Sequence, residues 1–311
     1  MAVRGTYCPY DVLPLTELID GTEFDVTTAF GRMHCLRTGA GADARGSGRG
    51  TVFLHGVHDD MNTWSPLVQA AADRRIDLGP ALFVDLPGFG RSENRRRRLN
   101  LPAVADTLLE VARSTAGFTS VRLVGHSMGT LVVAEMAVRQ PGAVESVHLA
   151  AGPYYSIVDT INGHPRGGLP GALATATFGT QYVLALAGRP GIGAVRVAKR
   201  AGLVRPLLWP FAAHPRRLRQ SVIDQLVGGL RPRSFRQAAR NGFRYRDGMD
   251  WSAISCPVSG AFGAKDRLVP AADARRLQAD LPDARITTVP EAAHLLHLEQ
   301  PYSALVAFGF A

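Results

Sequence analysis

The sequence contains few lysines, few cysteines and no long uninterrupted apolar run. Only two of its 35 basic residues are lysines, so nearly all of the positive charge is carried by arginine. The three cysteines, Cys8, Cys35 and Cys256, are widely separated and form no CxxC pair. This spacing argues against a disulfide framework and against a cysteine-based metal site, and it predicts three reduced thiols.

Membrane-spanning and secretion signals are also missing. The longest apolar stretch, residues 173–187, is broken by Thr, Gly and Gln, and it is shorter than the roughly 20 residues that cross a bilayer. The N-terminal segment carries charges and prolines throughout and lacks the apolar centre of a signal peptide. We therefore expect a cytoplasmic protein without a transmembrane segment.

The positive charge is unevenly distributed. The whole chain has a net charge of +9, whereas residues 153–250 hold fourteen arginines and one lysine against four aspartates and no glutamate, a net charge of +11. A second basic run, NRRRRLN (94–100), is expected to be a solvated cluster on a loop, with contact to a substrate or a carrier as the alternative. No nucleic-acid recognition motif accompanies the arginines, so nucleic acid is not an expected partner.

Short β-rich runs alternate with helical patterns, which predicts an α/β fold with a parallel sheet and crossover helices. From residue 153 to residue 250 the pattern changes to helix-like segments separated by Gly and Pro, and after residue 251 the alternation resumes. The predicted hairpin is 24–38, the predicted strands are 51–56, 81–88, a run ending at 125, 145–152, 257–263 and 284–290, and the predicted helices are 62–75, 101–115, a helix ending near 140, 271–281 and one from 295.

One motif carries the chemistry. The apolar run VRLV ends at Gly125, and Ser127 stands between Gly125 and Gly129 immediately before a helical stretch. In a GxSxG turn between a strand and a helix, the serine is held in a strained conformation with its hydroxyl exposed. A serine needs a base and an orienting acid to act as a nucleophile. Asp266 and His294 each follow a later predicted strand, and the chain order serine, acid, histidine is the one that accompanies a GxSxG turn of this kind.

The motifs together resemble the α/β-hydrolase fold superfamily, of the kind with a helical cap inserted after strand 6. The matching segments are HGVHDDMNTW (55–64), DLPGFGRS (85–92), GHSMG (125–129), GAKDRLVP (263–270) and AHLLHLEQP (293–301). The resemblance implies a mostly parallel eight-stranded sheet flanked by helices. It also implies a core domain formed by residues 1–152 and 251–311 and a helical cap, or lid, formed by residues 153–250.

Carried over by position, the resemblance implies that Ser127 is the nucleophile, Asp266 the acid and His294 the base. The backbone N–H groups of Val57 and Met128 would form the oxyanion hole. Two positions depart from the usual pattern, because Ala293 and Thr130 stand where glycine is common.

Further polar residues near these motifs have expected roles. His55 and His126 resemble residues that brace the oxyanion loop, His297 is expected to be a packing residue, and Asp85 is expected to hold the turn that follows it. His58, Asp59 and Asp60 are adjacent and cannot readily converge on one ion, so no metal site is expected. The expected substrate contacts are His58, Trp64, Tyr154 and Tyr155.

The expected activity is hydrolysis of a carboxylic ester or thioester with a hydrophobic, polyketide-like acyl part, through an acyl-enzyme and without a cofactor. A C–C bond hydrolase, an acyltransferase and a ligand-binding homologue without turnover remain alternatives. The basic cap fits either an anionic carrier, such as a coenzyme A conjugate or an acidic acyl-carrier protein, or an anionic membrane surface, or only a solvated arginine-rich face.

Overall fold

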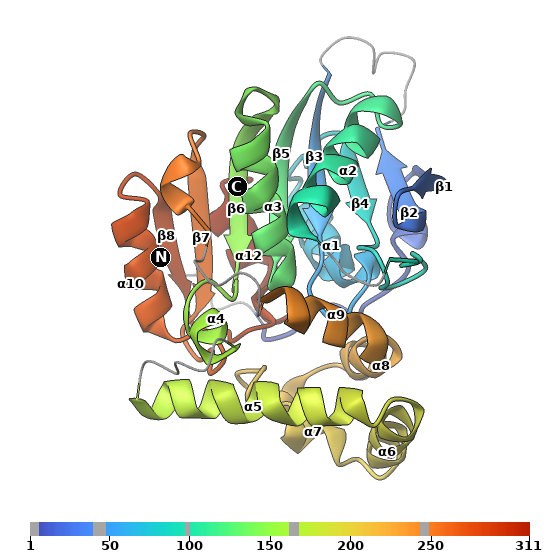
Figure 1. The fold of residues 1–311 in the computed structure, drawn as a ribbon, viewed down its shortest axis with the longest axis vertical. Helices are drawn as coiled ribbons and strands as arrows, with labels where there is room; N and C mark the ends of the chain where they lie inside the picture. Colours follow the sequence, from blue (N-terminus) through green and yellow to red (C-terminus); the bar gives the residue numbers. More distant parts are fainter. Residues whose placement is uncertain (1–5, 40–47, 97–99, 162–167, 243–248) are drawn as a thin grey trace.

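The structure is a computed structural model, and it describes residues 6–39, 48–96, 100–161, 168–242 and 249–311. Of the predicted basic cluster at 94–100, residues 97–99 lie outside the described part. The chain forms one central sheet with helices on both faces and a group of helices at one end (Figure 1).

The sheet has eight strands in the order β1-β2-β4-β3-β5-β6-β7-β8. β1 pairs antiparallel with β2, and β2 pairs antiparallel with β4, while every later pairing is parallel. The predicted fold class, a mostly parallel eight-stranded α/β-hydrolase sheet, is therefore confirmed. The strands are β1 Gly21–Thr28, β2 Gly31–Thr38, β3 Arg49–Leu54, β4 Ala81–Val84, β5 Ser120–His126, β6 Val144–Ala150, β7 Val258–Gly263 and β8 Arg285–Val289.

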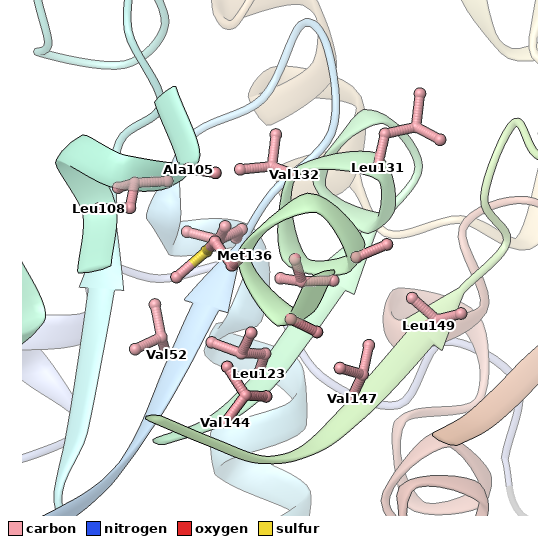
Figure 2. Packing of buried hydrophobic residues seen from close by; sticks show 14 of the residues in the cluster. Val52, Ala105, Leu108, Leu123, Leu131, Val132, Met136, Val144, Val147 and Leu149 are labelled. Atoms are coloured by element: carbon pink, nitrogen blue, oxygen red, sulfur yellow. The ribbon is translucent and has the colours of Figure 1, made fainter. Parts of the chain in front are cut away.

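Two apolar clusters cover the two faces of the sheet. On one face the strands pack against α2 (Leu101–Ser114), α3 (Met128–Arg139) and α10 (Ala271–Asp280), and on the other against α1 (Ser65–Asp73) and α12 (Pro301–Phe308). Figure 2 shows Leu108 of α2 and Met136 of α3 above Val52, Leu123 and Val147 of the strands. Because both faces are covered, the central strands are apolar along most of their length, as parallel strands usually are.

Between β6 and β7 the described residues form helices and no strand. These are α4 Ser156–Ile161, α5 Gly168–Leu186, α6 Arg189–Arg200, α7 Val204–Leu207, α8 Gln220–Gly228 and α9 Pro232–Gly242. In Figure 1 they lie together at one end of the sheet, near the carboxyl ends of β5 and β6. We call residues 153–250 the helical insertion. Within the described residues, no helix combines the length and the apolar character that crossing a membrane would require.

The predicted C-terminal helix from residue 295 is two helices, α11 (Leu296–Glu299) and α12. Gln300 has φ −139° and ψ 61°, which is not helical, and Pro301 then begins α12. A proline cannot donate the backbone hydrogen bond that a continuous helix needs at this point, so it begins a new helix. This break returns the chain to the sheet immediately after the segment that carries His294.

Candidate active site

Ser127 occupies the sharp turn between β5 and α3. Its backbone has φ 50° and ψ −121°, a conformation that a residue with a side chain adopts only under strain. A Cβ on Gly125 would lie 2.6 Å from the Gly129 carbonyl oxygen, and a Cβ on Gly129 would lie 2.8 Å from the His55 carbonyl oxygen. The two glycines are therefore required by close backbone packing around the turn.

Thr130 follows the turn and stabilises it. Its side chain is fully buried, and its hydroxyl donates a hydrogen bond of 2.6 Å to the Ser127 carbonyl oxygen. The Ser127 N–H donates to the Ala150 carbonyl oxygen of β6 at 2.9 Å. Thr130, which stands where glycine is common, thus adds a side-chain hydrogen bond that glycine could not make.

The structure brings Ser127, His294 and Asp266 together in one hydrogen-bonded chain. His294 Nε2 lies 3.0 Å from Ser127 Oγ, and His294 Nδ1 lies 3.1 Å from Asp266 Oδ2. The other carboxylate oxygen of Asp266 accepts hydrogen bonds from the N–H groups of Leu268 and Val269 at 2.8 and 2.9 Å. With Nδ1–H directed at the carboxylate, Nε2 is left to accept the serine proton.

Glu299, which the sequence analysis did not single out, holds the segment before His294. Its buried carboxylate accepts hydrogen bonds from the Ala293 N–H at 2.5 Å, the Tyr7 hydroxyl at 2.6 Å and the Ala213 N–H at 2.6 Å. Burial raises the pKa of Glu299 to about 7, although the three donors oppose this shift. One side chain therefore connects the N-terminal segment, the helical insertion and the loop of His294.

His55 and His126 fasten the loops around the serine. His55 Nδ1 lies 2.6 Å from the Gly56 carbonyl oxygen, and its Nε2 accepts the Leu86 N–H at 3.0 Å. His126 Nε2 donates to the His294 carbonyl oxygen at 2.9 Å. Burial lowers the pKa of both histidines, so both are neutral near neutral pH. His55 therefore holds the loop after β3, as expected, whereas the hydrogen bond of His126 holds the segment of His294.

Asp85 holds the turn after β4, as predicted. Its carboxylate oxygens accept the Met61 N–H at 2.8 Å and the Arg91 N–H at 2.7 Å. Burial raises the pKa of Asp85, and these donors lower it. Asp85 thereby ties the loop after β3 to the loop after β4, both of which border the site.

Val57 and Met128 are the residues whose N–H groups the resemblance assigns to an oxyanion hole. Both line a cavity together with Ser127 and His294. Met128 is the first residue of α3, and the first N–H groups of a helix have no acceptor within that helix. Gly56 packs so closely on the serine that a Cβ there would lie 2.9 Å from the Ser127 Cβ. This places the chain at Val57 beside the serine side chain.

Buried polar residues form a small group behind the site. Asp59, His126 and His297 each offer one possible metal-ligand atom, and these atoms lie within 4.8 Å of one another. Each residue already makes a protein contact, because Asp59 accepts from Gln225 Nε2 at 2.9 Å, His126 bonds to the His294 segment and His297 Nε2 lies 2.8 Å from a buried threonine hydroxyl. Burial raises the pKa of Asp59 to about 7 and lowers that of His297 to about 3. His297 is thus buried and packed, as expected.

Two apolar cavities meet at the serine. One has a volume of about 130 Å³ and extends among α2, α3, α4, α5 and α9, and the other has a volume of about 210 Å³ and extends among α5, α6, α7 and α8. Both are lined by Val57, Ser127, Gln181, Phe211 and His294. The walls are mostly hydrophobic, so the arrangement can accept apolar groups on two sides of a bond attacked by the serine.

Of the four expected substrate contacts, His58 lines the second cavity, where its ring stacks on Phe235 at 4.7 Å. Burial, reinforced by Arg231, lowers its pKa to about 4. Trp64, Tyr154 and Tyr155 line neither cavity. Trp64 and Tyr154 are buried in the core, and the hydroxyl of Tyr155 bonds to a surface carboxylate. None of these three aromatic side chains therefore borders the cavities beside the serine.

Comparisons with known proteins agree with the observed fold. Residues 51–308 match the family model described as the alpha/beta hydrolase family. A curated relative from Pectobacterium atrosepticum, a pimeloyl-[acyl-carrier protein] methyl ester esterase, is 27% identical over 80% of this chain and 89% of its own length. Another from Pseudomonas putida, the dihydrolipoyllysine-residue acetyltransferase component of an acetoin cleaving system, is 26% identical over 80% of this chain.

The chain spans 59% of the length of the Pseudomonas protein, and 42% and 54% of the lengths of two further curated relatives. Among solved structures, a thermophilic esterase from Thermogutta terrifontis is 20% identical, with a TM-score of 0.67 over 92% of this chain and 96% of its own. At this level of identity, the structural match shows the fold.

Proposed function

This chain belongs to the alpha/beta hydrolase family, and we propose that it is a serine-dependent hydrolase that cleaves a carboxylic ester or thioester of a hydrophobic acyl compound. The observation that supports this most directly is the hydrogen-bonded chain of Ser127, His294 and Asp266 at the meeting point of two apolar cavities. The esterase names of the Pectobacterium relative and of the Thermogutta structure favour the same chemistry.

In the proposed mechanism, Ser127 Oγ attacks the substrate carbonyl carbon while His294 Nε2 takes the hydroxyl proton. Asp266 keeps the imidazole oriented and stabilises its charged form. The negative charge on the carbonyl oxygen is stabilised by the N–H groups of Val57 and Met128. His294 then gives its proton to the leaving alcohol or thiol, and a water molecule activated by the same histidine hydrolyses the acyl-enzyme.

We propose that the helical insertion, residues 153–250, acts as a cap over this site. It supplies Phe178, Gln181 and Phe211 to the cavity walls beside Ser127. The remaining residues, 1–152 and 251–311, would form the core domain that carries the reacting groups. The division explains why the reacting groups and most of the second cavity's walls come from different parts of the chain.

A thioester is the second candidate substrate. The strongly basic composition of the insertion favours an anionic leaving group such as a coenzyme A conjugate or an acyl-carrier protein. The Pectobacterium relative is named for an acyl-carrier protein ester, and the Pseudomonas relative for acetyl transfer. Transfer of the acyl group to an acceptor other than water is the corresponding alternative outcome.

The deciding experiment compares matched acyl chains, from acetyl to dodecanoyl, as p-nitrophenyl esters and as coenzyme A thioesters, with Ser127→Ala as the control. Removal of the serine should lower kcat by about 10³-fold or more. A preference for thioesters that weakens at high salt would identify a thioesterase, and equal rates on oxoesters would identify an esterase. Covalent labelling of Ser127 by a fluorophosphonate without turnover of any ester would identify a ligand-binding homologue, and unchanged activity in Ser127→Ala would contradict the mechanism.

A further inference from the structure

Exposed apolar side chains are concentrated on one part of the helical insertion. Among the described residues, eight large hydrophobic side chains are exposed, and seven of them lie between residues 183 and 209. We call these seven the outer apolar face: Val183, Leu184, Leu186, Val197, Leu203, Leu207 and Trp209. Five of them lie on α5, α6 and α7, and Leu203 and Trp209 lie just before and just after α7. In Figure 1 these three helices form the end of the molecule beyond the sheet. Clustered exposed apolar side chains mark a contact surface rather than an ordinary solvated one.

The same part of the chain has no acidic residue. The 64 residues between Asp159 and Asp224 contain eight arginines and one lysine, with no aspartate or glutamate. On α6, Arg189, Arg196 and Arg200 are exposed, and they make no ion pair with any described residue. Lys199 of the same helix pairs with Asp224 at 2.6 Å, so the positive charges beside the outer apolar face that have no ion pair among the described residues are those of these three arginines.

The second cavity connects this face to the serine. Leu184 and Leu207 are 38% and 65% exposed, so both belong to the outer apolar face. Both also line the cavity that reaches Ser127 and His294. An acyl chain that enters between these leucines would therefore reach the site along apolar walls.

We propose that the outer apolar face docks on an anionic lipid bilayer. The apolar side chains would enter the boundary between headgroups and acyl chains, and the arginines of α6 would pair with lipid phosphates. An acidic carrier protein would match the charges but would leave most of the seven apolar side chains in water, whereas a bilayer accommodates both. The docking follows from the surface alone. The entry of a lipid acyl ester through the second cavity rests on the proposed function.

Docking is tested on the full chain with the Ser127→Ala substitution, so that no lipid is consumed. The protein is sedimented with vesicles of phosphatidylcholine alone and with vesicles of equal parts phosphatidylcholine and phosphatidylglycerol. Of the three tryptophans, Trp209 is exposed while Trp64 and Trp251 are buried, so a blue shift of the fluorescence on binding reports insertion of this face. We expect binding to the anionic vesicles, weakened when salt rises from about 0.1 M to about 1 M, because the screening length falls from about 10 Å to about 3 Å.

The apolar part is tested with the triple substitution Val183→Ser, Leu186→Ser and Val197→Ser. These side chains are exposed and line neither cavity, so hydrolysis of a short water-soluble ester by the otherwise wild-type chain should be unchanged. Vesicle binding and the fluorescence shift should both be lost. Val306→Ser, which alters the exposed hydrophobic residue outside this face, should bind vesicles normally.

The charged part is tested with Arg196→Glu combined with Arg200→Glu. The matched control is Arg233→Glu with Arg275→Glu, which changes the net charge equally at exposed arginines on α9 and α10. The first pair should weaken partition into anionic vesicles by about tenfold or more, because each basic residue at an anionic surface contributes appreciably to binding. Equal losses in both pairs would show that only net charge matters and would overturn the docking face.

The two proposals fail separately. A protein that hydrolyses short esters but does not sediment with anionic vesicles would overturn the docking and leave the proposed function intact. A protein that binds the vesicles through this face but hydrolyses no ester would overturn the function and support the docking. Binding to an acidic acyl-carrier protein, lost in Arg196→Glu with Arg200→Glu, together with indifference to vesicles, would assign the face to a protein partner and overturn the bilayer proposal.

Discussion

Glu299→Gln is the most informative substitution outside the reacting groups. Glu299 is fully buried and joins three separate segments through hydrogen bonds from Tyr7, Ala213 and Ala293. Glutamine has nearly the same shape, but one of its terminal atoms is a donor and faces a donor. This mismatch should cost the variant about 1–3 kcal/mol of stability, and because glutamine does not titrate, position 299 contributes no pH dependence to the stability of the variant.

The pH dependence of the wild-type stability gives a more specific prediction. Burial raises the pKa of Glu299 from its ordinary 4.5 to about 7. A carboxyl group whose pKa is higher in the folded chain than in the unfolded chain stabilises the fold fully below the lower value. That stabilisation is lost as the pH rises from 4.5 to 7, and it amounts to about 3 kcal/mol, since one pKa unit equals about 1.4 kcal/mol.

Urea unfolding at a series of pH values between about 4 and 8 measures this effect as a difference between the two proteins. Other buried groups, such as Asp59 and His58, titrate in both proteins and cancel in the difference. The stability advantage of the wild type over Glu299→Gln should shrink as the pH rises through this window. The Tyr7 hydroxyl lowers the pKa of Glu299, so Tyr7→Phe should raise this pKa and extend the pH range of the stability loss to higher values. Parallel pH profiles for wild type and Glu299→Gln would refute the raised pKa.

Three further substitutions test the turn, the loops and the cavities. Gly129→Ala should destabilise the protein by about 1–3 kcal/mol in thermal denaturation, because the new methyl group would lie 2.8 Å from the His55 carbonyl oxygen; an unchanged Tm would contradict this packing. Asp85→Ala leaves two backbone N–H donors without their acceptor and should cost about 2–4 kcal/mol in urea unfolding, whereas a cost near zero would show that water replaces the carboxylate. Leu131→Trp narrows the cavity of about 130 Å³ that extends among α2, α3, α4, α5 and α9, so the variant should prefer shorter acyl chains while it still hydrolyses acetyl esters. An unchanged preference for acyl-chain length would place the acyl chain in the other cavity.

The fold could be predicted largely from local patterns. The glycines around Ser127, the alternation of strands and helices, and the order Ser127, Asp266, His294 are all visible in the sequence because each depends on short stretches of chain. Pro301 is also visible in the sequence, but the prediction of a single helix from residue 295 did not use it, and the structure divides that helix into α11 and α12 at this proline.

The supporting residues were harder to predict, because their partners lie far away in the chain. Glu299 bonds to Tyr7 across nearly the whole sequence, and nothing near either residue marks the pair. The aromatic residues Trp64 and Tyr154 were also predicted to contact the substrate. Their side chains instead enter the core, since the direction of a side chain after a strand end depends on the path of the following loop.

The reacting groups and the cavity walls come from different parts of the chain, and this explains why the sequence motifs predict the type of reaction better than they predict the substrate. The hydroxyl, imidazole and carboxylate that meet at the site all follow strands of the sheet, where the backbone fixes their positions. The second cavity is lined mainly by α5, α6, α7 and α8, whose relative placement depends on packing between helices that share no sequence motif. Changes in these helices can reshape the cavity while leaving the hydrogen bonds of His294 intact. The helical insertion, rather than the strand ends, is therefore the part of the chain that we expect to determine which acyl compound is cleaved.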